Sequence, residues 1–196
     1  DLRTPQPLHP CNPLYSIQFA QKSVKRTMDP AIFTNNLSKQ YGDVTAVDDL
    51  SLHVSRGEIY AFLGLNGAGK TTTIRMLLGM IKPTGGQATV LGKRISGGRN
   101  QPWNSVGYLV ETANAYPDLT VRQNLEVMRR LRPGVASAAI ARAIERLGLT
   151  QYADRRAGTL SLGNAQRLGL AKALMHDPEL LILDEPANGL DPAGIV

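Results

Sequence analysis

The sequence predicts an α/β fold, and two segments lead to this prediction. The glycine-rich stretch GLNGAGKT at residues 64–71 lies between an apolar, β-prone segment at 57–63 and a segment at 71–81 whose apolar residues recur at helical spacing. The continuous apolar run ELLILDEP at 179–186 is typical of a strand buried on both faces of a parallel sheet. Strands that alternate with helices in this way indicate a sheet covered by helices.

The composition is that of one sizeable globular domain. The chain has 196 residues, of which 42% are hydrophobic, and this is typical of soluble globular proteins. No stretch approaches the ~18 consecutive apolar residues of a membrane-spanning helix, and the first residues, DLRTPQPLHP, lack the layout of a signal peptide. The single Cys11 fits a reducing compartment. These observations predict a cytoplasmic protein.

The net charge of +6 is a weak indication of a nucleic-acid or anionic membrane partner. The positive residues are spread along the chain, and aromatic residues make up only 5% of it. Nucleic-acid-binding surfaces usually combine a clustered basic patch with aromatic residues. We therefore expect no nucleic-acid partner.

The first part of the chain divides into an irregular and a regular stretch. Residues 1–27 contain four prolines and no sustained period, which predicts a disordered extension outside the fold, with Met28 as the natural start. Short alternating segments at 31–54 predict a partly exposed antiparallel sheet. A turn at 82–86 separates these from further strands predicted at 87–92 and 105–110.

Residues 64–71 have the composition of a phosphate-binding loop. Gly64, Gly67 and Gly69 allow left-handed torsions, so several backbone N–H groups can converge on one anion. The helix that follows adds unpaired N–H groups and partial positive charge, Lys70 can reach the β- and γ-phosphates, and the Thr71 hydroxyl can bind Mg²⁺. The spacing G-x-x-x-x-G-K-[ST] is that of the P-loop, and the alternative of a simple glycine-rich turn is disfavoured by the flanking strand and helix. The other residues expected to contact the nucleotide are Leu65, Asn66, Ala68 and Thr72.

The apolar run at 179–186 ends in two carboxylates, Asp184 and Glu185. Ligands of open α/β sheets bind at the carboxyl ends of the strands, so we expect both side chains beside the P-loop. One carboxylate can hold Mg²⁺, while its neighbour orients a water molecule for attack on the γ-phosphate. The alternative, a solvated strand end, is disfavoured because a P-loop is present.

Helices dominate the region between these motifs. A capping-box spacing at Thr120 and Gln123 opens a helix that a Pro-Gly pair ends, and a second helical pattern follows at 137–148. We expect residues 112–165 to form a helical insertion in the α/β core. A further helix in 160–174 begins after Ser161, whose hydroxyl and neighbouring N–H groups suit an anion. That site can serve a nucleotide bound to another subunit, and an ordinary helix cap is an equally good interpretation.

Together these segments resemble the ATP-binding subunit of ATP-binding cassette (ABC) transporters, with the match covering residues 28–196. The resemblance implies a P-loop NTPase fold with a RecA-like parallel core, an N-terminal antiparallel β subdomain and a helical subdomain. It also implies an aromatic contact to ATP from Tyr41, a Walker A motif at Gly64 to Thr71, a Q-loop at Glu111, a Walker B motif ending at Asp184, and a D-loop GLDP that contains Asp191. The family signature would comprise Ser161, Leu162, Gly163 and Asn164.

Two motifs depart from the common family pattern. The signature is LSLGN rather than LSGGQ, and Glu111 stands where many members have glutamine. Both features resemble the bacterial ABC-2 type exporters that include bacitracin- and lantibiotic-resistance pumps. The implied metal site comprises Thr71, Asp184 and Glu111, and the last of these would add negative charge near Mg²⁺ and ATP.

The chain is shorter than the family pattern at its C-terminal end. The family continues with a strand beside the P-loop strand and a switch histidine that contacts the γ-phosphate, and none of His9, His53 and His176 stands at that position. His176 is interpreted as a residue near a helix end. The expectation is a C-terminally truncated chain that hydrolyses ATP poorly.

The resemblance implies an ATPase with ATP and Mg²⁺ as its ligands and Glu185 as its general base. It would form a homodimer with a second ATP-binding subunit at the cytoplasmic face of the membrane, and it would power export by a membrane-spanning permease. The implied cargo is an antibiotic peptide or drug. A soluble ABC ATPase acting on nucleic acid or ribosomes, and an inactive nucleotide-binding fragment, are the alternatives. The transported substrate is not readable, because in this architecture the membrane subunit handles it.

Overall fold

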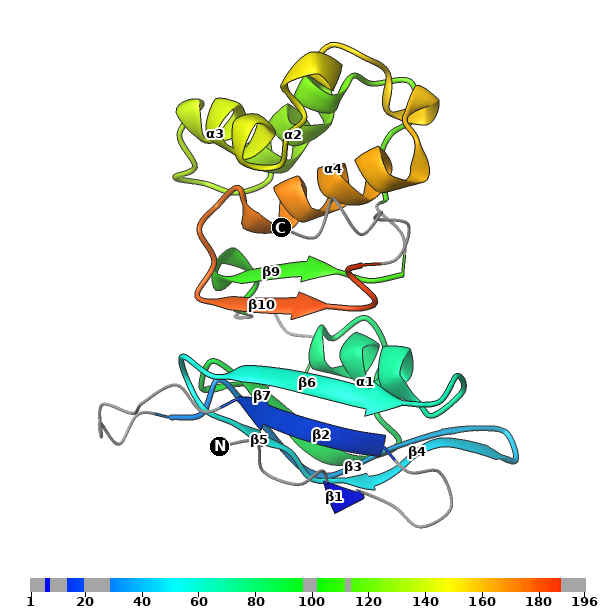
Figure 1. The fold of residues 1–196 in the computed structure, drawn as a ribbon. Helices are drawn as coiled ribbons and strands as arrows, with labels where there is room; N and C mark the ends of the chain where they lie inside the picture. The colour runs from blue at the N-terminus through cyan, green and yellow to red at the C-terminus, as the bar shows by residue number, and fades with distance from the viewer. Residues whose placement is uncertain (1–5, 8–13, 20–28, 97–101, 112–113, 188–196) are drawn as a thin grey trace. The chain divides into compact units, whose positions relative to one another are not determined.

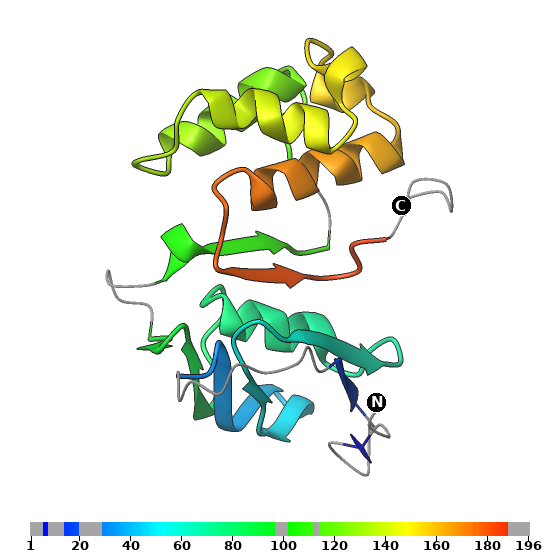
Figure 2. The same ribbon diagram turned by 60° about the vertical axis from the view of Figure 1, so that its left-hand side comes forward.

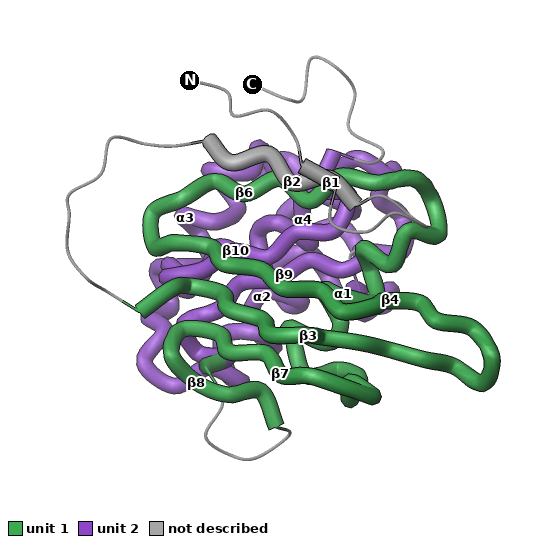
Figure 3. The backbone as a smooth tube through the Cα atoms, turned by 90° about the horizontal axis from the view of Figure 1, so that it is seen from below, with its two compact units in different colours: residues 1–102 green, residues 103–196 purple. Residues whose placement is uncertain are grey.

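The structure is a computed structural model of the chain, shown as a ribbon in Figure 1. It describes residues 29–96, 102–111 and 114–187, together with the backbone of two strands at 6–7 and 14–19. The chain divides into two compact units, residues 1–102 (unit 1) and residues 103–196 (unit 2), which Figure 3 colours separately.

Unit 1 contains the antiparallel sheet that the alternating segments predict. Its strands are β3 (Ile32–Tyr41), β4 (Val44–Leu50), β5 (His53–Val54), β7 (Gly85–Val90) and β8 (Lys93–Arg94). They run in the order β4-β3-β7-β8, with β5 also paired to β3. The buried Thr34 hydroxyl joins β3 to the end of β4 and to the residues just after it, because it donates to Leu50 O at 2.9 Å and accepts from Leu52 N at 2.8 Å.

The predicted strand–loop–helix also lies in unit 1. Strand β6 (Ile59–Gly64) leads through the glycine-rich loop into α1 (Lys70–Leu77), whose buried face comprises Thr73, Ile74, Met76 and Leu77. Strand β6 pairs antiparallel with β2 (Leu14–Phe19), and β2 pairs with β1 (Gln6–Pro7).

The pairing of β2 with β6 differs from the disordered extension expected for residues 1–27. An unpaired strand edge presents a row of N–H and C=O groups, and an added strand satisfies them. The segment Leu14–Phe19 contains isoleucine and aromatic residues that favour strands, and the prolines around it obscured this signal. The rest of that extension lies outside the described residues.

Unit 2 contains a parallel strand pair covered by helices. Strands β9 (Val106–Leu109) and β10 (Leu180–Leu183) pair in parallel, with Val106 opposite Leu180 and Leu109 opposite Leu183. Helix α4 (Leu162–Leu174) packs on this pair, and α2 (Val121–Arg130) and α3 (Ala138–Arg146) lie beyond it (Figure 1 and Figure 2). Single-turn 3₁₀ helices occupy Trp103–Ser105, Thr150–Tyr152 and Ala157–Thr159.

The helices of unit 2 share one apolar core, which brings α4 into the same cluster as the predicted insertion at 112–165. Its buried members are Val121, Leu125, Ala139, Ile140, Ala143, Ile144, Leu149, Ala153, Ala157, Leu168, Ala171 and Met175. Among the described residues, no helix is long and apolar enough to cross a membrane.

Strand β10 is less buried than its apolar sequence predicts. Ile182 is 6% exposed, whereas the adjacent Leu181 is 37% exposed. Successive side chains of a strand point to opposite faces, so one face of β10 is covered and the other is only partly covered. On β9, a Cβ added at Gly107 would lie 2.2 Å from Ala173 O of α4, so glycine is what allows helix and strand to approach so closely.

The capping box predicted at the start of α2 is confirmed. Thr120 Oγ1 accepts from Gln123 N at 3.1 Å, and Gln123 Oε1 accepts from Thr120 N at 2.9 Å. Two donors that the first helical turn leaves unpaired are thus satisfied reciprocally.

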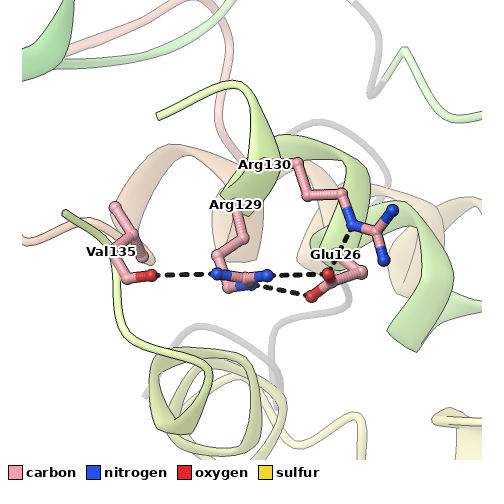
Figure 4. A network of polar contacts seen from close by, with 4 residues as sticks. All are labelled: Glu126, Arg129, Arg130 and Val135. Carbon is pink, nitrogen blue, oxygen red and sulfur yellow. Dashed lines mark hydrogen bonds and ion pairs between the residues drawn. The ribbon is translucent and has the colours of Figure 1, made fainter. Parts of the chain in front are cut away.

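An ion-pair network closes the last turn of α2 (Figure 4). Glu126 accepts from Arg129 through both carboxylate oxygens, each at 2.8 Å, and from Arg130 Nε at 2.7 Å. Arg129 Nη1 also donates to Val135 O at 3.3 Å, which connects the helix end to the loop before α3. The hydrogen bonds from Arg129 and then Arg130 lower the pKa of Glu126 from 4.5 to about 2.

We expect Leu125→Ala to lower the free energy of unfolding by about 2 to 5 kcal/mol, because the Leu125 side chain is fully buried and its truncation leaves a cavity. Leu131→Ala is the matched control at the end of the same helix. Leu131 is 68% exposed, so its truncation should change stability by no more than about 0.5 kcal/mol. Urea denaturation followed by circular dichroism measures both, and equal losses would contradict the assigned core.

We expect the stabilising effect of Glu126 to be lost in acid. Because its pKa is lowered in the folded chain, the ionised group stabilises the fold above pH 4.5 and loses this effect as the pH falls toward about 2. Glu126→Gln should therefore be less stable than the parent near neutral pH, and the two should converge as the pH is lowered. Denaturation curves at several pH values and low salt test this, and a difference independent of pH would refute the ion-pair assignment.

Candidate functional site

The glycine-rich loop of unit 1 needs glycine at the position that starts α1. Gly69 is the N-cap residue with φ 87° and ψ 8°, a left-handed conformation that side chains disfavour. A Cβ at this position would also lie 2.3 Å from Ala46 O. Both the torsion and the close approach of the two backbones therefore exclude larger residues.

Lys70 spans the loop that precedes it. Its Nζ atom donates to Gly64 O at 2.7 Å and to Leu65 O at 3.0 Å. The loop is closed by a further bond from Ala68 N to Leu65 O at 3.1 Å. The ammonium group is thus held over the concave backbone, while Leu65 and Asn66 are exposed at its rim.

The beginning of α1 fits an anion. Its first turn contains no acidic residue, and its N-cap residue, Gly69, has no side chain with which to cap the helix. The N–H groups at a helix start have no partner within the helix and combine with a partial positive charge. Thr71 and Thr72 stand in this turn, partly exposed, and Thr73 N bonds to Gly69 O at 2.8 Å to begin the helix. A phosphate group is the kind of anion that such a helix start suits.

Tyr41 is the last residue of β3, and its side chain is partly exposed. The residue is 48% exposed, and Lys39 Nζ lies 4.8 Å from the ring centroid. Its role toward a nucleotide base stays a prediction.

Unit 2 brings three predicted acidic residues to one edge of the strand pair. Glu111 follows β9, and Asp184 and Glu185 follow β10, so all three stand at the carboxyl ends of adjacent parallel strands. Asp184 N donates to Leu109 O at 2.8 Å, which continues the pairing one residue further. Asp184 is 4% exposed, whereas Glu111 and Glu185 are exposed.

The predicted metal residues belong to both units. Thr71 is in unit 1, and Asp184 and Glu111 are in unit 2. Among the described residues, no group of three or more His, Cys, Asp and Glu side chains could hold a metal ion by itself. The three-residue metal site stays a prediction.

The signature segment begins α4 as an N-cap. Ser161 has an extended backbone, and its hydroxyl accepts from Asn164 N at 3.4 Å. The first turn of α4 contains no acidic residue, and Leu162 is 66% exposed. Gly163 and Asn164 are half-buried in that turn. The cap is therefore present, and a second role toward a nucleotide stays a prediction.

Two buried polar side chains of α4 were not predicted. Gln166 Nε2 donates to Glu185 O at 3.4 Å and to Pro186 O at 3.3 Å, and Lys172 Nζ donates to Asn114 O at 2.5 Å. Burial lowers the pKa of the Lys172 ammonium. The sequence did contain one signal for the burial of Lys172. It stands four residues after the core residue Leu168 and therefore lies on the same helical face.

The two described histidines, His53 and His176, belong to different units. His53 is in β5, with its ring edge-on to Phe33, and His176 follows α4, as predicted. His176 Nε2 lies 3.2 Å from Val106 O at the opposite end of β9 from Glu111. Burial, and then the charge of Arg132, lower the pKa of His176. His9, and Asp191 with the remainder of the GLDP segment, lie outside the described residues.

Comparison with known proteins identifies the family. A sequence model described as ABC transporter matches residues 47–188. The bacitracin transport ATP-binding protein BcrA of Bacillus licheniformis is 48% identical over 86% of this chain and 55% of that protein. The Nod factor export ATP-binding protein I of Burkholderia orbicola (strain AU 1054) is 43% identical over 80% of this chain and 53% of that protein.

Solved structures agree with this assignment. The structure of an ATP binding subunit of an ABC transporter superposes with a TM-score of 0.73 at 29% identity, over 84% of this chain and 70% of that one. The α/β P-loop fold predicted from the sequence is therefore confirmed. The chain spans about half the length of the curated relatives that it matches. It belongs to the ABC transporter family and is related to the ATP-binding subunits of that family.

Proposed function

We propose that the full-length protein binds ATP with Mg²⁺ and hydrolyses it to power export by a membrane-embedded partner. The observation on which the proposal rests is the loop of unit 1, where the left-handed Gly69 begins α1 without a capping side chain and Lys70 Nζ is held over the concave backbone. Converging N–H groups and a mobile cation suit a polyphosphate chain better than a single carboxylate.

Different residues of unit 1 bind different parts of ATP in this proposal. Tyr41 stacks on the base, which its 48% exposure allows. The backbone of residues 64–72 surrounds the phosphates, and Lys70 moves from its carbonyl partners to the β- and γ-phosphates. Thr71 offers a hydroxyl to Mg²⁺, which when bound neutralises part of the phosphate charge.

The acidic edge of unit 2 supplies the residues for hydrolysis. Asp184, buried and held in line by its bond to Leu109, is the proposed metal ligand, with Glu111 as a further candidate. Glu185 is exposed one residue further on and is the proposed general base that accepts a proton from the attacking water. Lys70 offsets the charge that develops on the transferred phosphoryl group.

The partners are inferred from the relatives and from the start of α4. We propose a homodimer in which Ser161 to Asn164, and Asp191, serve the nucleotide of the opposite subunit. Residues 28–196 would constitute the ATP-binding domain, with residues 112–165 as its helical subdomain. The matched relatives are named for bacitracin transport and for Nod factor export, which supports an export function. In this proposal the protein lies at the cytoplasmic face of the membrane and its partner is a membrane-spanning permease. An antibiotic peptide or a drug is the proposed class of cargo.

We expect Lys70→Ala in the full-length protein to weaken ATP binding by about 1.5 to 3 kcal/mol, because a charge-assisted contact to the phosphates is lost. Lys82→Ala is the control, since it removes an exposed lysine of unit 1 outside the loop. Calorimetric titration with Mg-ATP measures both variants. A Lys70→Ala variant that binds as tightly as the Lys82→Ala variant would exclude the phosphate-binding role.

We expect Glu185→Gln to keep ATP binding and to reduce turnover by roughly 10² to 10⁴-fold, because the amide keeps the shape of the side chain and cannot accept a proton. Phosphate release and calorimetry on the same preparation separate chemistry from binding. Glu179→Gln is the control at the other end of β10, where it follows Pro178 and should leave turnover near that of the parent. Near-parental turnover in Glu185→Gln would show that another group is the base.

A further inference from the structure

The buried amide of Gln166 contacts the backbone at the end of β10. Gln166 stands in α4 five residues after the cap residue Ser161 and is only 4% exposed. Its Nε2 atom donates to Glu185 O at 3.4 Å and to Pro186 O at 3.3 Å. One side-chain amide thus binds two consecutive carbonyl groups, and the first belongs to the proposed base.

The conformation of Glu185 needs a contact of this kind, because no packing around its side chain fixes it. Its side chain is exposed, so packing does not fix its direction. Its backbone has φ 46°, a left-handed conformation that costs a non-glycine residue about 1 kcal/mol or more and persists only where surrounding contacts impose it. The adjacent Asp184 is fixed differently, by its burial and by its backbone bond to β9.

The helix that carries Gln166 is closely packed in unit 2. Helix α4 is anchored in the core of unit 2 through Leu168, Ala171 and Met175, and it approaches β9 closely at Gly107. A side chain that projects from such a helix has a defined position, which is a requirement for a group that orients another. Its two acceptors follow the strand that this helix covers.

We infer that Gln166 is a positioning residue, which holds the Glu185 and Pro186 carbonyls and so aims the Glu185 carboxylate. The inference rests on the proposed role of Glu185 as general base. When the amide is removed, Glu185 is still present, but its backbone can leave the left-handed conformation. Its carboxylate then no longer points in the direction that the Gln166 contacts impose. Phosphoryl transfer depends on placement, so the expected effect is on turnover rather than on binding of ATP.

The test uses Gln166→Met in the full-length protein, alone and combined with Glu185→Gln. Methionine has nearly the same length and volume and cannot donate to either carbonyl. We expect kcat to fall about 10- to 100-fold, as is usual when a reacting group is misplaced by about 1 Å, while KM changes by less than about twofold. In the Glu185→Gln background, Gln166→Met should cause no further loss of turnover, because the group through which it acts is already absent.

Asn124→Leu is the matched control for the removal of a buried amide. Asn124 is fully buried in α2, and its Nδ2 atom donates to the carbonyls of Tyr116, Leu119 and Thr120. This variant should lower the thermal stability, and any change in turnover should be the same factor in the parent and in the Glu185→Gln background.

Gln166→Leu replaces Gln166→Met if the latter does not fold, as judged by circular dichroism.

The outcomes separate the inference from the proposed function. A Gln166→Met variant with parental kcat, or one that loses the same factor with and without Glu185, overturns the positioning role while the base assignment stands. Near-parental turnover in Glu185→Gln alone overturns the base assignment and with it the inference. A loss of kcat that disappears in the Glu185→Gln background supports both.

Discussion

The close packing of α4 on β9 is the constraint on which unit 2 depends. It is possible only because position 107 is glycine, since a Cβ there would lie 2.2 Å from Ala173 O. The same helix contributes Leu168, Ala171 and Met175 to the core that joins it to α2 and α3. Three polar residues connect this helix to the backbone around it. Ser161 caps its first turn, Gln166 donates to the Glu185 carbonyl after β10, and Lys172 donates to the Asn114 carbonyl.

Parallel pairing has a direct consequence for the candidate site. Glu111 and the pair Asp184 and Glu185 are far apart in the sequence, and they meet at one edge because β9 and β10 run in the same direction in register. An antiparallel arrangement would have put them at opposite ends of the strands. Two of these residues, Glu111 and Glu185, have left-handed backbones, with φ 57° and 46°. Strained backbone of this kind is common where side chains must be aimed rather than packed.

The loop of unit 1 meets a different constraint, which is backbone proximity. Gly69 must be left-handed and must pass close to Ala46 O, and both conditions are set by the turn into α1. Strand β6, which delivers the chain to this loop, is paired along its length with β2, and Gly64 itself is opposite Leu14. The segment that stabilises the strand of the P-loop therefore precedes the region that matches the family.

The sequence by itself determined the elements and most of the candidate residues. Glycine, lysine and threonine at fixed spacing predicted the loop, the Thr120 and Gln123 pair predicted the start of α2, and the apolar run predicted β10, because these signals are local. Only the tertiary structure decided that β2 pairs with β6, that Leu181 is partly exposed, and that Gln166 and Lys172 hold backbone carbonyls. Strand pairing and polar contacts of this kind join segments distant in the chain, and a polar residue on a helix looks the same in sequence whether it faces water or a buried carbonyl.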